Sequence, residues 1–287
     1  MGDSYMLNNA AAADYERERL NKQFFIFNEA MEGNLLPPHI AKDISDNPKP
    51  RICDMATGSA IWLTELAKTL PPSAELFGYD YDDSKFPKDN LPSNIKLGKA
   101  NVYESFPEDL EGTFDVVSLR LFYLAARKDK VVDMLKNLSK LLRPGGWLVW
   151  FDVDTKTASM EPPSDAVFRF IKALHKYSVA MNMDTSIPIG TLRYLKEASL
   201  TECENDIRSI DGGYHRVADS EWLQSSRWLF YGAIMGICGG IARSPHNIEG
   251  MRSQEDLDNF ENKLVRDMDQ AEKIQLFLVQ TWGRRAF

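Results

Sequence analysis

The segment Arg51-Ile52-Cys53-Asp54-Met55-Ala56-Thr57-Gly58-Ser59-Ala60 decides the fold of this chain. It begins as a short apolar strand and ends in a turn of small residues, and a helical pattern over residues 60–70 follows it. A strand that leads through a tight turn into a helix is typical of an open α/β sheet. The turn lacks the glycines of a dinucleotide site and the lysine of a P-loop. It therefore favours a ligand without a pyrophosphate.

Short apolar runs alternate with helical patterns on both sides of this segment. Strands are predicted at 51–55, 75–80, 94–98, 114–119 and 147–153, with helices over 60–70 and 131–142. Two further strands are predicted near 204–210 and 274–282. The run 147–151 is apolar on both faces, as in a central parallel strand. The pattern predicts an α/β fold with a doubly wound, mostly parallel, seven-stranded sheet.

Helical patterns outside the sheet predict a cap. They cover residues 15–32 and 165–181 and resume at 219, and a capping box of Ser253 and Asp256 begins a helix that we expect to reach 273. The apolar run 228–242 is shorter than the roughly 20 residues that span a bilayer, so we expect a buried helix pair or a lid. We predict one fold in three segments: a helical cap segment at 1–45, the ligand-binding core at 46–155, and cap helices with the last two strands at 156–287.

Composition excludes several classes of partner. With 42 acidic and 34 basic residues, the net charge of -8 argues against binding to nucleic acid. The three cysteines form no C-x-x-C pair, and the four histidines share no metal-ligand spacing, so neither disulfides nor a metal site is expected. The sequence predicts a cytoplasmic protein that binds a small molecule and does not associate with a membrane.

Asp80 gives the first indication of the ligand. It ends the predicted strand 75–80, about 20 residues after the turn, where a carboxylate accepts hydrogen bonds from ribose hydroxyls. A small-residue turn followed by this acid predicts a site for an adenosine that lacks phosphates.

Four motifs in this order resemble class I S-adenosylmethionine-dependent methyltransferases. They are the turn at 54–59, Gly78-Tyr79-Asp80, Phe114-Asp115-Val116-Val117 and Leu142-Arg143-Pro144-Gly145-Gly146-Trp147. Tyr5, the run 16–23 and the ending 280–285 resemble small fungal secondary-metabolism methyltransferases, a group with thiol-methylating enzymes and a global regulator of secondary metabolism. The resemblance implies a Rossmann-like fold, S-adenosylmethionine as the cofactor and S-adenosylhomocysteine as the product. It is faint over 156–250, which would select the substrate.

The resemblance also implies which residues bind the cofactor. The turn would hold the methionine end, Asp80 the ribose and Tyr81 the adenine, and Asn101 stands where the family commonly has an acid. The residues implied for the cofactor are Asp54, Ala56, Thr57, Gly58, Asp80, Tyr81, Asn101, Val102 and Arg120. This chain departs from the family at Asn101 and at Ala60, which replaces a glycine and would place a methyl group near the cofactor.

Aromatic residues of the cap predict the substrate pocket, because a cap over an open sheet encloses apolar space. The residues expected to line it are Phe24, Phe27, Tyr123, Trp222, Phe230 and Tyr231. Aromatic residues at helical spacing are more often core than binding surface. A lone histidine is likewise more often structural than catalytic, and His215, next to Gly212-Gly213-Tyr214, is the one candidate catalytic group.

Three functions remain open at the level of sequence. The leading hypothesis is methyl transfer to a thiol, hydroxyl or carboxyl group of a small hydrophobic secondary metabolite, which needs little more than positioning and dehydration. Ala60 and Asn101 keep a second hypothesis open, in which the pocket catalyses a pericyclic cyclisation or an isomerisation without methyl transfer. The third hypothesis is a regulatory protein without enzymatic activity.

Overall fold

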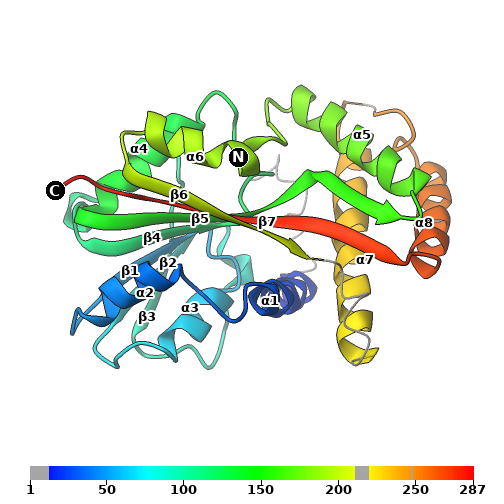
Figure 1. Ribbon diagram of the computed structural model, residues 1–287. Helices are drawn as coiled ribbons and strands as arrows, with labels where there is room; N and C mark the ends of the chain where they lie inside the picture. The colour runs from blue at the N-terminus through cyan, green and yellow to red at the C-terminus, as the bar shows by residue number, and fades with distance from the viewer. Residues whose placement is uncertain (1–12, 211–219, 247) are drawn as a thin grey trace.

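A seven-stranded sheet forms the centre of the molecule (Figure 1). The computed structural model describes residues 13–210, 220–246 and 248–287. The strands are β1 (Arg51–Met55), β2 (Glu75–Asp80), β3 (Ile95–Lys99), β4 (Phe114–Arg120), β5 (Leu142–Glu161), β6 (Thr201–Ile210) and β7 (Lys273–Arg284). Their order is β3-β2-β1-β4-β5-β7-β6, with β1 to β5 parallel and β7 antiparallel to both neighbours. The predicted Rossmann-like fold is confirmed.

Helices cover both faces of this sheet, because its central strands are apolar on both sides. On one face lie α2 (Pro38–Ser45) and α3 (Ile61–Ala67), where Ile52 of β1 belongs to the same buried cluster as Leu63. The opposite face carries α4 (Val131–Leu141) and α6 (Ile187–Glu197), where Cys53 of β1 belongs to the same cluster as Leu138. Successive residues of β1 thus enter opposite cores, as the pleat of a strand requires. Two short turns of 3-10 helix, η3 (Asp83–Lys85) and η4 (Glu108–Leu110), follow β2 and β3.

The predicted helical cap lies beyond the carboxyl ends of the parallel strands (Figure 1). It consists of α5 (Asp165–Ala180), α7 (Ser220–Arg243) and α8 (Gln254–Asp269), which pack against one another. The cap is connected to the sheet through β5, which precedes α5, and β7, which follows α8. These two strands stay paired as far as Glu161 and Lys273. α1 (Ala13–Ala30) contacts α7 and α3 and so connects the cap to the sheet.

Among the boundaries that differ from the sequence prediction, three concern the cap and the strands next to it. The run 228–242 belongs to the single helix α7 and not to a helix pair, because packing against α1, α5 and α8 offsets the unfavourable helix propensity of its glycines. β5 is longer than 147–153, since its pairing with β7 continues past the parallel strands. The helix that begins at the capping box of Ser253 and Asp256 ends at Asp269, before β7 starts.

The described helices include no candidate for a membrane span, by length and hydropathy taken together.

Candidate functional site

A cavity of about 680 Å³ lies at the carboxyl ends of β1, β2 and β4 and extends to α5 and α7. Ligands of open α/β sheets bind at this edge, at the point where the strand order reverses. In this sheet the order reverses between β1 and β4. The cavity wall includes all the residues predicted for the cofactor, namely Asp54, Ala56, Thr57, Gly58, Asp80, Tyr81, Asn101, Val102 and Arg120. It also includes Phe24, Phe27, Tyr123 and Phe230 from the predicted substrate pocket.

The turn after β1 depends on left-handed backbone at three residues. The φ angle is 57° at Ala56, 55° at Gly58 and 57° at Ala60. At Gly58 a Cβ atom would lie 3.2 Å from Cδ1 of Leu20, so glycine allows α1 to approach the turn closely. The sequence analysis expected the methyl group of Ala60 near the cofactor. Instead, Ala60 is fully buried and is not part of the cavity wall.

Asp80 is held by two backbone N–H groups at the end of β2. Gly58 donates to Oδ2 at 2.8 Å and Asp82 donates to Oδ1 at 3.0 Å. Burial raises the pKa of Asp80 above its ordinary value, although these N–H groups act in the opposite direction. Each carboxylate oxygen retains a second lone pair, so Asp80 can accept hydrogen bonds from two further hydroxyls. A ribose diol has this donor pattern.

Two buried polar atoms beside the turn indicate a polar ligand. Among the residues that the structure describes, neither Oδ1 of Asp54 nor Oγ of Ser59 has a hydrogen-bond partner, and both residues line the cavity. Oδ2 of Asp54 accepts from Oγ1 of Thr57 at 2.7 Å. Burial raises the pKa of Asp54 to about 6, against the effects of the Thr57 hydroxyl and the Arg120 charge. Because buried polar atoms are nearly always paired, these atoms suit the polar methionine end of S-adenosylmethionine.

Residues after β3 form the third part of this end of the cavity. Oδ1 of Asn101 accepts from the Tyr103 N–H at 3.1 Å, and its Nδ2 donates to Oε1 of Glu104 at 2.9 Å. The side chain is thus a turn residue that still has one lone pair and one N–H free for a base. Val102 beside it is buried, whereas Tyr81 is 48% exposed at the end of β2. These three residues form a half-open, partly apolar surface that suits an adenine ring.

Arg120 ends β4 and its side chain is held among aromatic rings. The guanidinium carbon lies 4.4 Å from the ring centre of Phe151, 5.8 Å from that of Phe24 and 5.9 Å from that of Trp62. Burial lowers the pKa of Arg120 to about 10, although the carboxylates of Asp54 and Asp152 oppose this effect. A pKa of about 10 leaves Arg120 charged at neutral pH.

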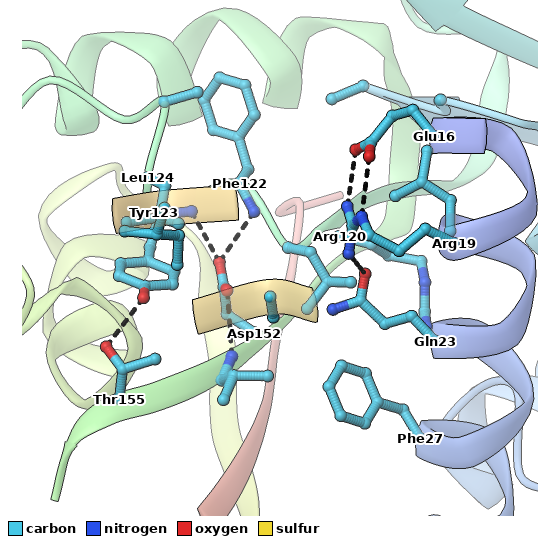
Figure 2. Close-up of a pocket in the computed structure, with 18 of the residues that line it drawn as sticks. Glu16, Arg19, Gln23, Phe27, Arg120, Phe122, Tyr123, Leu124, Asp152 and Thr155 are labelled. Atoms are coloured by element: carbon cyan, nitrogen blue, oxygen red, sulfur yellow. Dashed lines mark hydrogen bonds and ion pairs between the residues drawn. The ribbon is translucent and has the colours of Figure 1, made fainter. Parts of the chain in front are cut away.

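Asp152 is a site residue that the sequence reasoning missed. Its Oδ2 accepts from the N–H groups of Phe122 at 3.0 Å and Tyr123 at 2.9 Å (Figure 2). It also accepts from Nε1 of Trp150 at 2.9 Å. Burial nevertheless raises the pKa of Asp152 to about 6. The carboxylate fixes the segment after β4, so its role is to position the cavity wall. An acid inside a predicted apolar strand was the signal that could have revealed it.

A second missed group lies on α1, on the side of the cavity opposite Asp152 (Figure 2). Arg19 forms a bidentate salt bridge with Glu16, in which Nε donates to Oε2 at 2.8 Å and Nη2 donates to Oε1 at 2.7 Å. Its Nη1 also donates to Oε1 of Gln23 at 3.2 Å. Both charged residues are buried, and all three line the cavity. Charged side chains at helical spacing normally face solvent, so the sequence analysis did not place these three side chains in the cavity.

The cap side of the cavity is mostly apolar. It is lined by residues of α5 and α7 and of the segment after α5, namely Val167, Phe170, Met181, Met183, Phe230, Ala233, Ile234 and Ile237. Where this side meets the strand ends, the hydroxyls of Tyr123 and Thr155, which both line the cavity, share a hydrogen bond of 2.8 Å (Figure 2). The cap side therefore suits an apolar molecule with a single polar group.

Some predicted residues do not join the cavity. Tyr231 donates a short hydrogen bond to Glu261 of α8 and is not part of the cavity wall, because it lies on another side of α7 than Phe230. Trp222 lies in α7, but its side chain is outside the described set, and His215 lies outside the described residues altogether. Within the described ranges, no three His, Cys, Asp or Glu side chains are grouped so as to hold a metal ion.

Comparisons with known proteins identify the family of the chain. A family model described as a methyltransferase domain matches residues 27–199. The methyltransferase grgD of a Penicillium species is 33% identical over 187 residues, which are 63% of this chain and 64% of that protein. The chain thus spans just under two thirds of that relative. The N-methyltransferase tcpN of Claviceps purpurea is 34% identical over 215 residues, which are 72% of this chain and 74% of that protein.

A solved structure has the same overall fold. It is a complex of the Trm112 methyltransferase activator of Haloferax volcanii with a methyltransferase, with a TM-score of 0.51 and 13% identity over 97% of both chains. The chain belongs to the methyltransferase-domain family, as a class I S-adenosylmethionine-dependent methyltransferase of the fungal secondary-metabolism group. The predicted family, enzyme class and cofactor are thereby confirmed.

Proposed function

We propose that this enzyme methylates a small, largely apolar secondary metabolite that binds on the cap side of the cavity. The observation that carries the proposal is the division of one cavity into two chemically different sides. Asp80, Gly58 and Asp54 supply polar groups at the strand ends, whereas α5 and α7 supply an apolar wall. A cofactor held at the strand ends would direct its sulfur toward the apolar side.

Bound S-adenosylmethionine would supply an electrophilic methyl group. The chain's own residues hold the reactants and exclude water, which is the main requirement of an in-line displacement. Gly58 would leave room for the cofactor at the turn, Asp80 would accept from its ribose, and Asn101 and Tyr81 would flank its base. The apolar residues of α5 and α7 hold the acceptor in a dehydrated position, and the Tyr123 and Thr155 hydroxyls can orient its polar group.

We include nitrogen among the possible methyl-acceptor atoms. The sequence suggested a thiol, hydroxyl or carboxyl acceptor, but the relative from Claviceps purpurea is named as an N-methyltransferase, as are verN of Clonostachys rogersoniana and sirN of Leptosphaeria maculans. An uncharged amine already has a lone pair for attack and releases its proton after transfer, so it needs no strong base in the cavity. We also place the reaction in a reducing, cytoplasmic setting, since all three cysteines are free.

Transfer of a labelled methyl group tests the function. The full chain would be incubated with S-adenosylmethionine that carries a deuterated methyl group and with an organic extract of a fungal culture, and products would be followed by mass spectrometry. We expect a metabolite that gains the labelled methyl group together with formation of S-adenosylhomocysteine. Asp80→Ala should lose this activity, whereas Tyr231→Phe, outside the cavity wall, should keep it.

The same experiment separates the competing hypotheses. Conversion of a metabolite into a product of unchanged mass would contradict methyl transfer and favour cyclisation or isomerisation. Binding of S-adenosylhomocysteine without conversion of any metabolite would favour a regulatory protein.

A further inference from the structure

An irregular stretch of β5 lies in the wall of the cavity. β5 and β7 pair regularly as far as Asp154, but the next four residues of β5, 155–158, lie opposite the single residue Leu276 of β7. β5 therefore bulges at this place. Thr155 and Ala158 of the bulge, and Leu276 opposite it, all line the cavity. Because bulges next to active sites commonly redirect a side chain, this one indicates that a residue within it contacts a ligand.

The two threonines of the bulge have different surroundings. The carboxylate of Asp154 accepts from the Lys156 N–H at 2.9 Å and from Oγ1 of Thr157 at 2.6 Å. Lys156 and Thr157 are exposed, and neither is part of the cavity wall. Thr155 is half-buried and lines the cavity. Thr157 thus stabilises the shape of the bulge, whereas Thr155 is the threonine that faces a ligand.

Tyr123 is held at two points by residues of β5 (Figure 2). Its hydroxyl shares a hydrogen bond of 2.8 Å with Oγ1 of Thr155, and its backbone N–H donates to Oδ2 of Asp152 at 2.9 Å. Tyr123 is also buried, with 5% of its surface exposed. The two hydroxyls, which we call the Tyr123–Thr155 hydroxyl pair, therefore have a fixed position in the cavity wall.

The hydroxyl pair lies beyond the parallel part of the sheet. Phe151 is the last residue of β5 that pairs with β4, and Thr155 comes four residues later, toward α5. At the usual rise of a strand, this spacing places Thr155 on the order of 10 Å past the strand ends. Asp80, by contrast, is the last residue of β2 itself. The pair is thus on the cap side of the cavity, where the proposed function has the acceptor.

The charged side chains of this part of the wall already have partners. Beyond β4 in the sequence, the described wall contains two charged residues, Arg127 and Asp152, and one amide, Asn182. Asp152 accepts hydrogen bonds on both oxygens, Arg127 pairs with Asp129 at 3.8 Å, and Asn182 donates to Asp129 at 2.7 Å. An acceptor with a carboxylate or an ammonium group would lose water here without gaining a counter-charge. This part of the wall therefore favours an uncharged acceptor.

The hydroxyl pair can still bind one polar group of a ligand. Its mutual hydrogen bond uses one O–H and one lone pair, so in either direction the Thr155 oxygen keeps at least one lone pair. A ligand N–H or O–H that donates to this oxygen keeps a lone pair of its own for attack on a methyl group. A nitrogen that instead accepts from the pair uses its only lone pair in the hydrogen bond. Donation by the ligand is therefore the productive arrangement.

We propose that the Tyr123–Thr155 hydroxyl pair selects the methyl acceptor, an uncharged molecule whose reacting nitrogen or oxygen carries a hydrogen that the pair binds. This inference rests on the proposed function and removes a carboxylate from the possible acceptors. In the reaction, the lone pair of the acceptor forms the bond to the methyl carbon, the carbon–sulfur bond breaks with its electrons on sulfur, and the acceptor's proton passes to water. When the acceptor is a hydroxyl or a secondary amine, the product lacks this hydrogen and binds the pair less well.

Three bicyclic probes of nearly equal shape test the selection. Tetrahydroquinoline has an N–H that stays uncharged at neutral pH, chroman has a ring oxygen without a hydrogen, and tetrahydroisoquinoline is protonated. Each probe would be titrated by NMR into the full chain saturated with S-adenosylhomocysteine. We expect tetrahydroquinoline to bind at least about threefold more tightly than chroman, the usual effect of one uncharged hydrogen bond. Tetrahydroisoquinoline should bind at least about tenfold more weakly than tetrahydroquinoline, because its charge would be buried without a partner.

Variants of the bulge assign the preference to the hydroxyl pair. Thr155→Val should bind tetrahydroquinoline and chroman equally, and Tyr123→Phe should reduce the preference, because each variant removes one hydroxyl of the pair. Thr157→Val is the matched control, since it makes the same change in the same bulge at an exposed position outside the cavity wall. It should keep the wild-type preference. All three variants should bind S-adenosylhomocysteine within about twofold of wild type.

The other outcomes overturn the inference in distinguishable ways. Equal binding of tetrahydroquinoline and chroman to wild-type protein would refute the N–H contact, and tightest binding of tetrahydroisoquinoline would refute the selection against charge. A preference that survives in both Thr155→Val and Tyr123→Phe would place the polar contact elsewhere. A preference lost in Thr157→Val as well, with a lowered unfolding temperature, would assign it to the shape of the bulge.

Two results would reach beyond the hydroxyl pair. Protein that binds S-adenosylhomocysteine but none of the three probes would contradict the apolar acceptor side of the proposed function. Protein that does not bind S-adenosylhomocysteine would contradict methyl transfer itself.

Discussion

The strand-end side of the cavity and its cap side are built from different kinds of contact. At the strand ends, few residues within a short stretch of chain define the site: Asp54 accepts a hydrogen bond from Thr57, and Asp80 accepts one from Gly58. On the cap side, Phe170, Phe230 and Ile237 come from helices far apart in the sequence and contribute apolar surface. Local polar geometry can preserve one cofactor, whereas an apolar wall of distant helices can change shape for different acceptors.

The largest expected effect concerns Asp152, which holds the segment between the two sides. Asp152→Ala leaves the N–H groups of Phe122 and Tyr123 and the indole of Trp150 without their acceptor. We expect the free energy of unfolding to fall by about 3–5 kcal/mol, measured by urea denaturation. The exposed Asp165→Ala should cost less than about 1 kcal/mol. Similar values for the two variants would contradict a structural role of Asp152.

The second effect is a pH dependence at Asp54. Its pKa is raised from 3.8 to about 6 in the folded state, so folding favours the protonated carboxyl group. The protonated group therefore contributes its full stabilisation below pH 3.8, and this stabilisation is lost as the pH rises through about 6. Asp54→Asn removes this loss. Without ligand, the variant should match the wild type near pH 4 and exceed it by about 3 kcal/mol at pH 7.5, in urea titrations. A difference that does not vary with pH would show that Asp54 does not titrate in this way.

The third effect concerns Asp80, the carboxylate that we propose binds the ribose. Asp80→Ala should weaken S-adenosylhomocysteine binding by at least about tenfold, or about 1.4 kcal/mol, in calorimetry. It should also weaken 5′-methylthioadenosine, which has the same adenosine without the amino-acid head, because both ligands contain the ribose. Retained affinity for both would mean that the ribose lies elsewhere.

The smallest expected effect concerns the cap side. Ile237 lies in the apolar wall and is 5% exposed, so Ile237→Ala should raise the KM of the acceptor by about tenfold through lost apolar contact. Its affinity for S-adenosylhomocysteine should stay within about twofold of wild type. Equal losses for acceptor and cofactor would show that the two sides of the cavity are not separate sites.

The same comparison explains what sequence could predict. Gly58 and Asp80 were predictable because the spacing of a turn and a strand end places them together, and the alternation of apolar runs with helical patterns predicted a mostly parallel sheet. Tyr231 was assigned to the pocket from helical spacing, but spacing along α7 does not say which side meets the cavity and which meets Glu261 of α8. Asp152 was missed because its donors Phe122 and Tyr123 lie about 30 residues away in the chain. The Glu16–Arg19 pair is local, but its burial arises only when α1 packs against other segments.

A crystal structure with bound S-adenosylhomocysteine tests the division of the cavity most directly. We predict ribose hydroxyls on Asp80, the methionine end of the ligand at the turn 54–59, and the sulfur facing the apolar wall of α5 and α7. An adenosine bound among Phe170 and Phe230, or a sulfur that faces away from them, would contradict the account.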